Sequence, residues 1–165
     1  MALAAGRSAF ESLKAEAARL REDNEGLEKQ NKQLEKEIQQ LKTQGAQAQA
    51  KNVPVRQVGS FHVYLAQFPG SMDPAILRSS ADAIQKSDPE PIIFLCDTQG
   101  FCVATTGKAA QKRGILANEL LKLSTEVAGG SGGGRPEIAQ GRLKEPARFS
   151  EIQKRLEGYI LEHAT

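Results

Sequence analysis

Leucine recurs at every seventh position near the start of the chain, and this repeat limits the possible folds more than any other feature of the sequence. An apolar period of 3.5 residues, sustained from Leu13 to Leu41, is typical of a coiled coil rather than of a helix on a protein surface. We therefore expect a coiled-coil helix over residues 11–43, preceded by a tail over residues 1–10 that is disordered or leads into the helix. The residues expected to line a dimer seam are Leu13, Leu20, Asn24, Leu27, Asn31, Leu34, Ile38 and Leu41.

Two asparagines interrupt the apolar seam. With the leucines at position d of the heptad, Asn24 and Asn31 fall at position a. Asparagine is costly inside an ordinary core, but two copies can pair across the axis of a two-stranded coil, where they set the register and disfavour higher oligomers. The seam therefore predicts that the chain forms a homodimer through this helix.

The charges beside the seam give mixed support to that dimer. In a parallel homodimer, Asp23 would face Glu28 of the second copy and repel it. Heterotypic pairing and antiparallel pairing therefore stay open, as does a lone helix that packs against another domain of a larger parent protein. Two other pairs would attract in the parallel arrangement: Glu16 with Arg21, and Glu37 with Lys42.

The composition changes after residue 43, where the leucine repeat stops. Residues 44–52 contain glycine and alternating alanine and glutamine, which predicts a linker or the frayed end of the coil. A globular domain is expected over residues 53–165, long enough to form its own core. Apolar and β-branched runs predict strands at 53–58, 61–68, 92–96 and 101–105, and apolar periodicity predicts helices beginning near residues 73, 112 or 114, and 149.

This order of elements predicts the fold class. It indicates an α/β (α+β) domain whose sheet is mixed or antiparallel and is covered by helices on one face. The strands at 92–96 and 101–105 form a hairpin and carry the two cysteines of the chain, Cys96 and Cys102. We interpret these cysteines as small core residues rather than as a disulfide.

Composition excludes several classes of protein. No stretch approaches the roughly 18 apolar residues that cross a bilayer, so we expect no membrane segment. The first six residues are too few for the apolar part of a signal peptide, and two cysteines suit a reducing compartment, so we expect a cytoplasmic protein. Two distant histidines and two cysteines make no metal-binding pattern, and no nucleophile lies beside a base. We therefore expect no catalysis, no cofactor and no bound metal.

A glycine-rich segment at residues 129–141 indicates a binding function. Five of its first six residues are glycine, so its backbone either adopts positive φ angles or lies close to another part of the structure. Residues 108–148 carry eight basic and four acidic side chains, a local net charge of +4. A flexible turn with exposed backbone N–H groups between cations can cradle phosphate groups or a nucleic-acid backbone. The alternative is a plain flexible linker.

Residues 132–140, with the sequence GGGRPEIAQ, resemble the glycine-rich signature of the C-terminal domain of alanyl-tRNA synthetases. The same module occurs as the DHH-associated domain of DHH-family phosphoesterases. The segment KRGILANELL at residues 112–121 resembles the start of the helix that precedes this signature, and the resemblance covers roughly residues 53–148. The Asp-His-His motif of the phosphoesterases is not present in this sequence.

The resemblance implies a non-catalytic module that binds tRNA and helps subunits to associate. In alanyl-tRNA synthetases this domain recognises the outer corner, or elbow, of tRNA, so the chain would act as part of such an enzyme or in trans to one. Arg135 would bind a phosphate through two donors, while Pro136 and Ile138 would fix the segment and pack beneath it. The expected nucleic-acid-binding residues are Lys112, Arg113, Gly132, Gly133, Gly134, Arg135, Gln140, Arg142 and Lys144.

Two other functions stay open. The chain could be a DNA-binding or regulatory module, because a basic segment does not distinguish nucleic acids well. It could also be a protein-interaction module that acts through its leucine zipper, with a purely structural glycine segment. The sequence leaves open the tRNA identity, the partner and direction of the coil, and whether the chain is a fragment of a larger synthetase.

Overall fold

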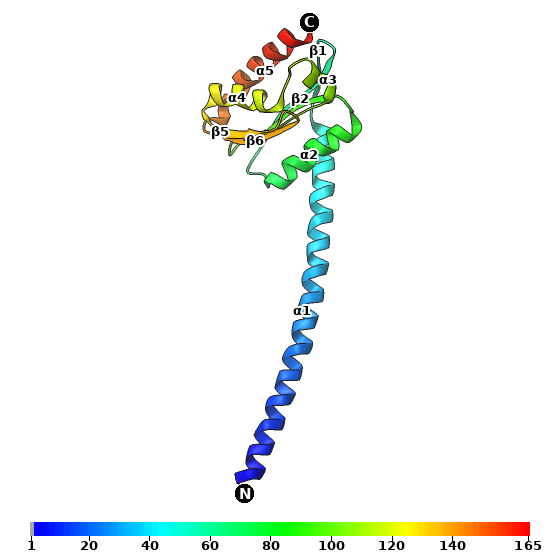
Figure 1. Cartoon of the computed structure of the whole chain (residues 1–165), viewed down its shortest axis with the longest axis vertical. Helices are drawn as coiled ribbons and strands as arrows, with labels where there is room; N and C mark the ends of the chain where they lie inside the picture. Colours follow the sequence, from blue (N-terminus) through cyan, green and yellow to red (C-terminus); the bar gives the residue numbers. More distant parts are fainter. Residues whose placement is uncertain (1) are drawn as a thin grey trace. The chain divides into compact units, whose positions relative to one another are not determined.

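The structure is a computed structural model that describes residues 2–165; Met1, the first residue of the expected tail, lies outside the described residues. The chain divides into two compact units, one ending at Lys42 and the other covering Thr43–Thr165. Helix α1 (Ala2–Asn52) makes up the first unit and continues into the second (Figure 1). The prediction of a helix over residues 11–43 is confirmed, while its pairing with a second helix stays a prediction.

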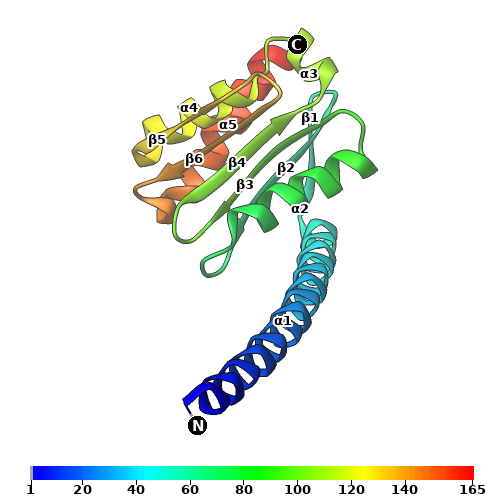
Figure 2. The same cartoon turned by 60° about the horizontal axis from the view of Figure 1, so that its bottom comes forward.

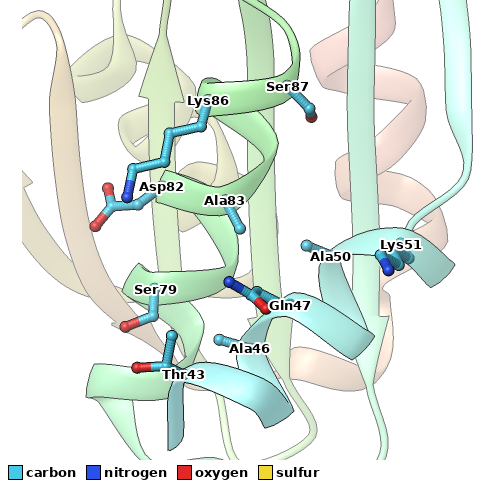
Figure 3. A pocket seen from close by; sticks show the side chains of 10 residues that line it. All are labelled: Thr43, Ala46, Gln47, Ala50, Lys51, Ser79, Asp82, Ala83, Lys86 and Ser87. Carbon is cyan, nitrogen blue, oxygen red and sulfur yellow. The ribbon is translucent and has the colours of Figure 1, made fainter. Parts of the chain in front are cut away.

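Residues 44–52 are helical, so the expected linker was wrong. Alternating alanine and glutamine look flexible because they lack an apolar stripe, yet both are good helix formers. The small alanines let these last turns of α1 lie against helix α2 (Pro74–Ser87), and Ala46 is only 1% exposed. Ala46, Ala50 and Ala83 line a groove of about 500 Å³ between the two helices (Figure 3). Burial against α2 therefore stabilises a segment that local sequence does not mark as helical.

The second unit is built on one six-stranded sheet with the order β1-β2-β3-β4-β6-β5. Strands β2 and β3 run parallel, and every other neighbouring pair is antiparallel, so the sheet is mixed, as predicted. The strands are β1 (Val55–Val58), β2 (Phe61–Phe68), β3 (Pro91–Asp97), β4 (Phe101–Thr106), β5 (Gly130–Gly134) and β6 (Ile138–Leu143).

Helices cover both faces of this sheet, so the expectation of one covered face was wrong (Figure 2). On one face, Leu77 and Ile84 of α2 pack with Ile93 of β3. On the other face, α4 (Ala117–Ala128) and α5 (Phe149–Ala164) cover Phe94 and its neighbours. Leu120 of α4 is fully buried in this part of the core. Every residue of β3 is buried, which is the pattern of a strand between two helical layers.

Two local predictions in this unit are confirmed. An oxygen of the Asp73 side chain accepts a hydrogen bond from the amide of Ala75 at 2.8 Å and caps α2. Strands β3 and β4 form the expected hairpin, in which Cys96 and Cys102 stand directly opposite each other, fully buried and free. Burial raises the pKa of both thiols, that of Cys102 to about 12, so both are protonated at neutral pH.

The helix expected from residue 112 or 114 begins later than predicted, and a separate short helix precedes it. The short α3 (Lys108–Lys112) ends before Gly114, whose φ of +82° interrupts the helix, and α4 begins only at Ala117. Between them, Ile115 is fully buried. The C-terminal helix α5 matches its prediction, and its buried face consists of Ile152, Leu156 and Ile160.

Candidate nucleic-acid interface

The glycine-rich segment is a strand, so the expected loop was wrong. Strand β5 pairs antiparallel with β6, and this hairpin ends the sheet at one edge. Glycine is depleted in strands, because it packs no side chain and loses more backbone freedom than other residues. Composition therefore indicates a loop here, whereas tertiary packing produces a hairpin.

The packing of this hairpin on α4 requires glycine at specific positions. A Cβ on Gly132 would lie 2.6 Å from the Cα of Gly141 and 2.7 Å from a methyl group of Leu121 on α4. Gly130 has a φ of +118°, which side chains disfavour. A Cβ on Gly133, in contrast, would meet no atom within 4 Å. The hairpin is therefore closed toward α4 and open on its other face.

The outer edge of β5 offers backbone hydrogen-bonding groups to a ligand. The amide of Lys144 donates to the carbonyl of Gly129, and the amide of Arg135 donates to the carbonyl of Ile138. Because bonded and non-bonded positions alternate along an antiparallel pair, Gly130, Gly132 and Gly134 direct their N–H and C=O groups away from β6. All five residues of β5 are exposed. The edge thus presents donors and acceptors without side chains in front of them.

The open face of the hairpin carries three side chains at alternate positions of β6. Ile138, Gln140 and Arg142 are exposed, whereas Ala139 and Leu143 are buried. Gln140 is the register partner of Val103, which belongs to the core under α2, so these side chains stand on the α2 side of the sheet. The expectation that Ile138 packs beneath the segment was wrong, since this residue is 38% exposed.

Strand pairing within the hairpin places residues that are several positions apart in the sequence directly opposite each other. Gly133 stands opposite Gln140, and Ser131 stands opposite Arg142. Ser131 was not among the expected binding residues, nor was Phe101, the partner of Arg142 on β4. The alternation of a strand would have revealed both, had the segment been recognised as one.

The expected cations fall into two groups at opposite ends of this hairpin. Arg135 lies in the turn between β5 and β6, at the end of the sheet where β4 leads into α3 and therefore to Lys112 and Arg113. Arg142 and Lys144 lie at the other end of β6. A strand rises about 3.3 Å per residue, so the two ends of β6 are separated by about 17 Å. The structure therefore does not gather all five cations into one patch.

Several basic residues near the hairpin are already paired with acids. Arg148 contacts Glu145 and Glu151, and Lys122 contacts Glu119. Arg113 donates a hydrogen bond to the carbonyl oxygen of Ala164 at 3.2 Å, at the end of α5. Within residues 2–165, no ion pair involves Lys112, Arg135, Arg142 or Lys144. These four cations are the ones placed to attract a polyanion.

The turn that holds Arg135 is fixed by its neighbour Pro136. The carbonyl oxygen of Pro136 accepts hydrogen bonds from the amide of Ala117 at 2.7 Å and from the hydroxyl of Thr106 at 2.9 Å. These bonds tie the turn to the start of α4 and the end of β4. The backbone of Pro136 therefore fixes the segment, as expected, but the expected packing of this residue beneath the segment was wrong, because Pro136 is exposed.

No group of three or more His, Cys, Asp or Glu residues within 2–165 is arranged to hold a metal ion. Over the same residues, no helix has the length and apolar character needed to cross a lipid bilayer.

Residues 59–162 match the DHHA1 domain family, and this span is more than half of the chain. The chain belongs to the DHHA1 domain family. The match includes the whole of the β5–β6 hairpin and helix α4 on which it packs. The resemblance noted in the sequence is thus confirmed at the level of the family.

The relatives of this DHHA1 domain include tRNA ligases. The alanine–tRNA ligase of Shouchella clausii is 30% identical over 156 residues, which are 92% of this chain and 16% of the ligase. The C-Ala domain of the alanyl-tRNA synthetase from Aquifex aeolicus is similar in structure, with a TM-score of 0.60 and 27% identity over 66% of this chain and 98% of that domain. The chain therefore spans about a sixth of the length of the ligase.

More distant proteins share the fold of this DHHA1 domain. RecJ from Thermus thermophilus superimposes with a TM-score of 0.58 at 18% identity, over 73% of this chain and 18% of RecJ. At that level of identity the likeness concerns the fold alone.

Proposed function

We propose that this chain is a non-catalytic tRNA-binding module that recognises the elbow of tRNA through the β5–β6 hairpin and dimerises through α1. The observation that carries the proposal is the exposed, side-chain-free edge of β5 beside unpaired cations, in a domain similar to the C-Ala domain of an alanyl-tRNA synthetase. The chain would act as part of such a synthetase or in trans to one, in the cytoplasm.

The edge of β5 suits a ribose–phosphate backbone. The outward N–H groups of Gly130, Gly132 and Gly134 can donate to phosphate oxygens, and their carbonyl groups can accept from ribose 2′-hydroxyls. The absence of side chains lets an RNA strand approach to hydrogen-bonding distance. A 2′-hydroxyl is a donor that DNA lacks, so the carbonyl groups favour RNA.

The open face of the hairpin would add base and sugar contacts. Gln140 can both donate and accept hydrogen bonds, and it stands beside Gly133, where nothing obstructs a flat group. Arg142 can bind a phosphate with two donors or stack on a base. Arg135 and Lys112 at the far end would contact other phosphates, because about 17 Å separates the two ends of β6.

Competition binding tests this function. The full chain is titrated with fluorescently labelled folded tRNA at two salt concentrations, and unlabelled folded tRNA, unfolded RNA and duplex DNA are added as competitors. We expect folded tRNA to compete best and binding to weaken as salt rises. Equal competition by duplex DNA would support the DNA-binding alternative. Absence of binding to every nucleic acid would leave the zipper as the functional element.

A further inference from the structure

The helical unit exposes an apolar seam that needs a partner. Leu13, Leu20, Leu27, Leu34 and Leu41 are between 54% and 67% exposed, and Ile38 is 51% exposed. Burying leucine side chains is strongly stabilising, and a lone helix in water would not gain that stabilisation.

The contact of α1 with α2 does not use this seam. In the second unit, five residues of α1 line the groove with α2, and none of them falls at position a or d of the heptad: Thr43, Ala46, Gln47, Ala50 and Lys51. In the frame that places the leucines at d, Ala46 falls at position b and Ala50 at position f, on the side of a helix away from a and d. The seam positions are therefore not needed for the packing of α1 on the domain.

The asparagines distinguish between the two directions of pairing. In a parallel, in-register dimer, position a faces position a, so Asn24 meets Asn24 and Asn31 meets Asn31, and each pair can exchange hydrogen bonds. In an antiparallel dimer, position a faces position d. Aligning all the leucines then places Asn24 opposite Leu27 and Asn31 opposite Leu20, which leaves every buried amide unpaired. Burying an amide without a hydrogen-bond partner is destabilising, so the antiparallel alignment is disfavoured.

The flanking charges are compatible with the parallel direction. Positions g and e of the next heptad meet across a parallel coil, which pairs Glu16 with Arg21 and Glu37 with Lys42, once on each side of the dimer. The one repulsive contact is Asp23 with Glu28. Two attractive sets and two asparagine pairs outweigh it.

We infer that α1 pairs with a second copy of this chain as a parallel, in-register two-stranded coil selected by Asn24 and Asn31. This inference rests on the dimerisation in the proposed function and adds its partner and direction. Because both chains then leave the coil at the same end, two tRNA-binding domains follow one coil, and a ligand carrying two copies of the tRNA elbow would bind with increased avidity.

Cysteine cross-linking tests the direction. Under mild oxidation, the Leu13→Cys variant of the full chain should form a covalent dimer with itself, because position 13 faces position 13 in the parallel coil. In the antiparallel alignment, position 13 faces position 38, so only a mixture of Leu13→Cys with Ile38→Cys chains would cross-link between unlike chains. The Gln33→Cys variant, at outer position c, is the control and should remain monomeric on a non-reducing gel. The native cysteines are buried and do not interfere.

A charge-reversal variant tests the direction of pairing independently of the cross-links. Replacing Asp23 with lysine turns both repulsive contacts with Glu28 into attractive ones, so the dimer dissociation constant should fall on the order of tenfold. The Glu22→Lys variant makes the same charge change at outer position f and should leave the constant unchanged. In the antiparallel alignment Asp23 approaches Gln30 instead, so equal constants for the two variants would overturn the parallel assignment.

The outcomes separate this inference from the proposed function. A dimer whose cross-links follow the antiparallel pattern overturns the direction and leaves tRNA binding and dimerisation in place. A monomer at all concentrations, measured by sedimentation, overturns both the direction and the dimerisation. Neither result bears on the tRNA site of the globular domain, which the competition experiment tests separately.

Discussion

Gly132 and Gly141 face each other across the β5–β6 hairpin so closely that a Cβ on either would lie less than 3 Å from the Cα of the other, at 2.6 and 2.9 Å. Leu121 of α4 lies under both, with a methyl group 2.7 Å from the added Cβ of Gly132. The glycines therefore serve two purposes. They let the hairpin pack on the helix, and they leave the backbone edge of β5 bare toward solvent.

Replacing Gly132 with alanine should destabilise the domain. The added Cβ would meet backbone atoms of Gly141 and Gln140, which cannot move as easily as a side chain, so we expect a loss of about 1–3 kcal/mol in the free energy of unfolding. Gly133→Ala is the matched control and should change stability by less than about 0.5 kcal/mol, because that site is open. Urea unfolding of both variants measures the difference. Equal stabilities would contradict the packing of the hairpin described above.

Replacing Arg142 with alanine should weaken tRNA binding without unfolding the protein. The side chain is exposed, and no ion pair within residues 2–165 involves it. Loss of one phosphate contact should reduce affinity on the order of tenfold and lower the slope of log affinity against log salt by about one. Arg155→Ala on the exposed side of α5, on the opposite face of the sheet, is the control. A similar loss in both variants would indicate general charge attraction rather than this surface.

Much of the fold could be predicted from local patterns, and the exceptions share one cause. The capped start of α2 and the β3–β4 hairpin have strong local signals, namely Asp73 before Pro74 and a short turn between two β-rich runs. Residues 44–52 and the strand β5 have none. Tertiary contacts determine their structure, because residues 44–52 pack on α2 and β5 pairs with β6 and packs on α4. Local helix and strand propensities take no account of tertiary contacts, so they indicated a linker at residues 44–52 and a loop at β5.

The candidate site shows the same limit. Gln140 and Arg142 were both predicted to bind nucleic acid, but a loop gives no reason to place them on one face. Strand alternation supplies that reason, and it also separates Arg142 from Arg135 by the length of β6. The sequence therefore suggested candidate binding residues, which stay a prediction, but it could not show that they lie at two ends of a hairpin.

The two cysteines should be inert toward thiol reagents in the folded protein. Burial raises the pKa of the Cys102 thiol to about 12 and raises that of Cys96 as well, so almost no thiolate exists at pH 8. We expect alkylation by iodoacetamide to be at least a hundredfold slower than in urea, on the order of the thiolate fraction lost. Mass spectrometry after timed quenching measures both rates. Rapid labelling of the native chain would contradict the buried pairing of β3 with β4.

The end of α2 should contribute a small pH-dependent stabilisation. Burial alone would raise the pKa of Asp88, but hydrogen bonds with His62 at 2.8 Å, the amide of Glu90 and the hydroxyl of Tyr64 outweigh it, so the pKa lies below its usual value. A lowered carboxyl pKa stabilises the fold above the unfolded value of about 4, and that stabilisation is lost as pH falls through the folded value.

The Asp88→Asn variant tests this contribution. Because His62 is largely exposed, we expect a loss of less than about 1 kcal/mol at pH 7, and the difference from the parent chain should shrink as pH falls below about 4. Asp82→Asn, which removes an exposed carboxylate from the same helix, should show no such pH dependence. Thermal unfolding across pH 3 to 7 provides the comparison, and a constant difference over that range would show that the hydrogen bonds do not depend on the charge of Asp88.

The most direct test of the tRNA-binding surface is to follow the backbone amides of the ¹⁵N-labelled chain by NMR during titration with a folded tRNA. We expect the largest shifts or losses of signal at Gly130, Gly132 and Gly134 of β5, at Gln140 and Arg142 of β6, and in the turn at Arg135. Amides of α5 should change little. Changes centred on α5 or on the helix of residues 2–42, with the hairpin unaffected, would contradict tRNA binding by the β5–β6 hairpin.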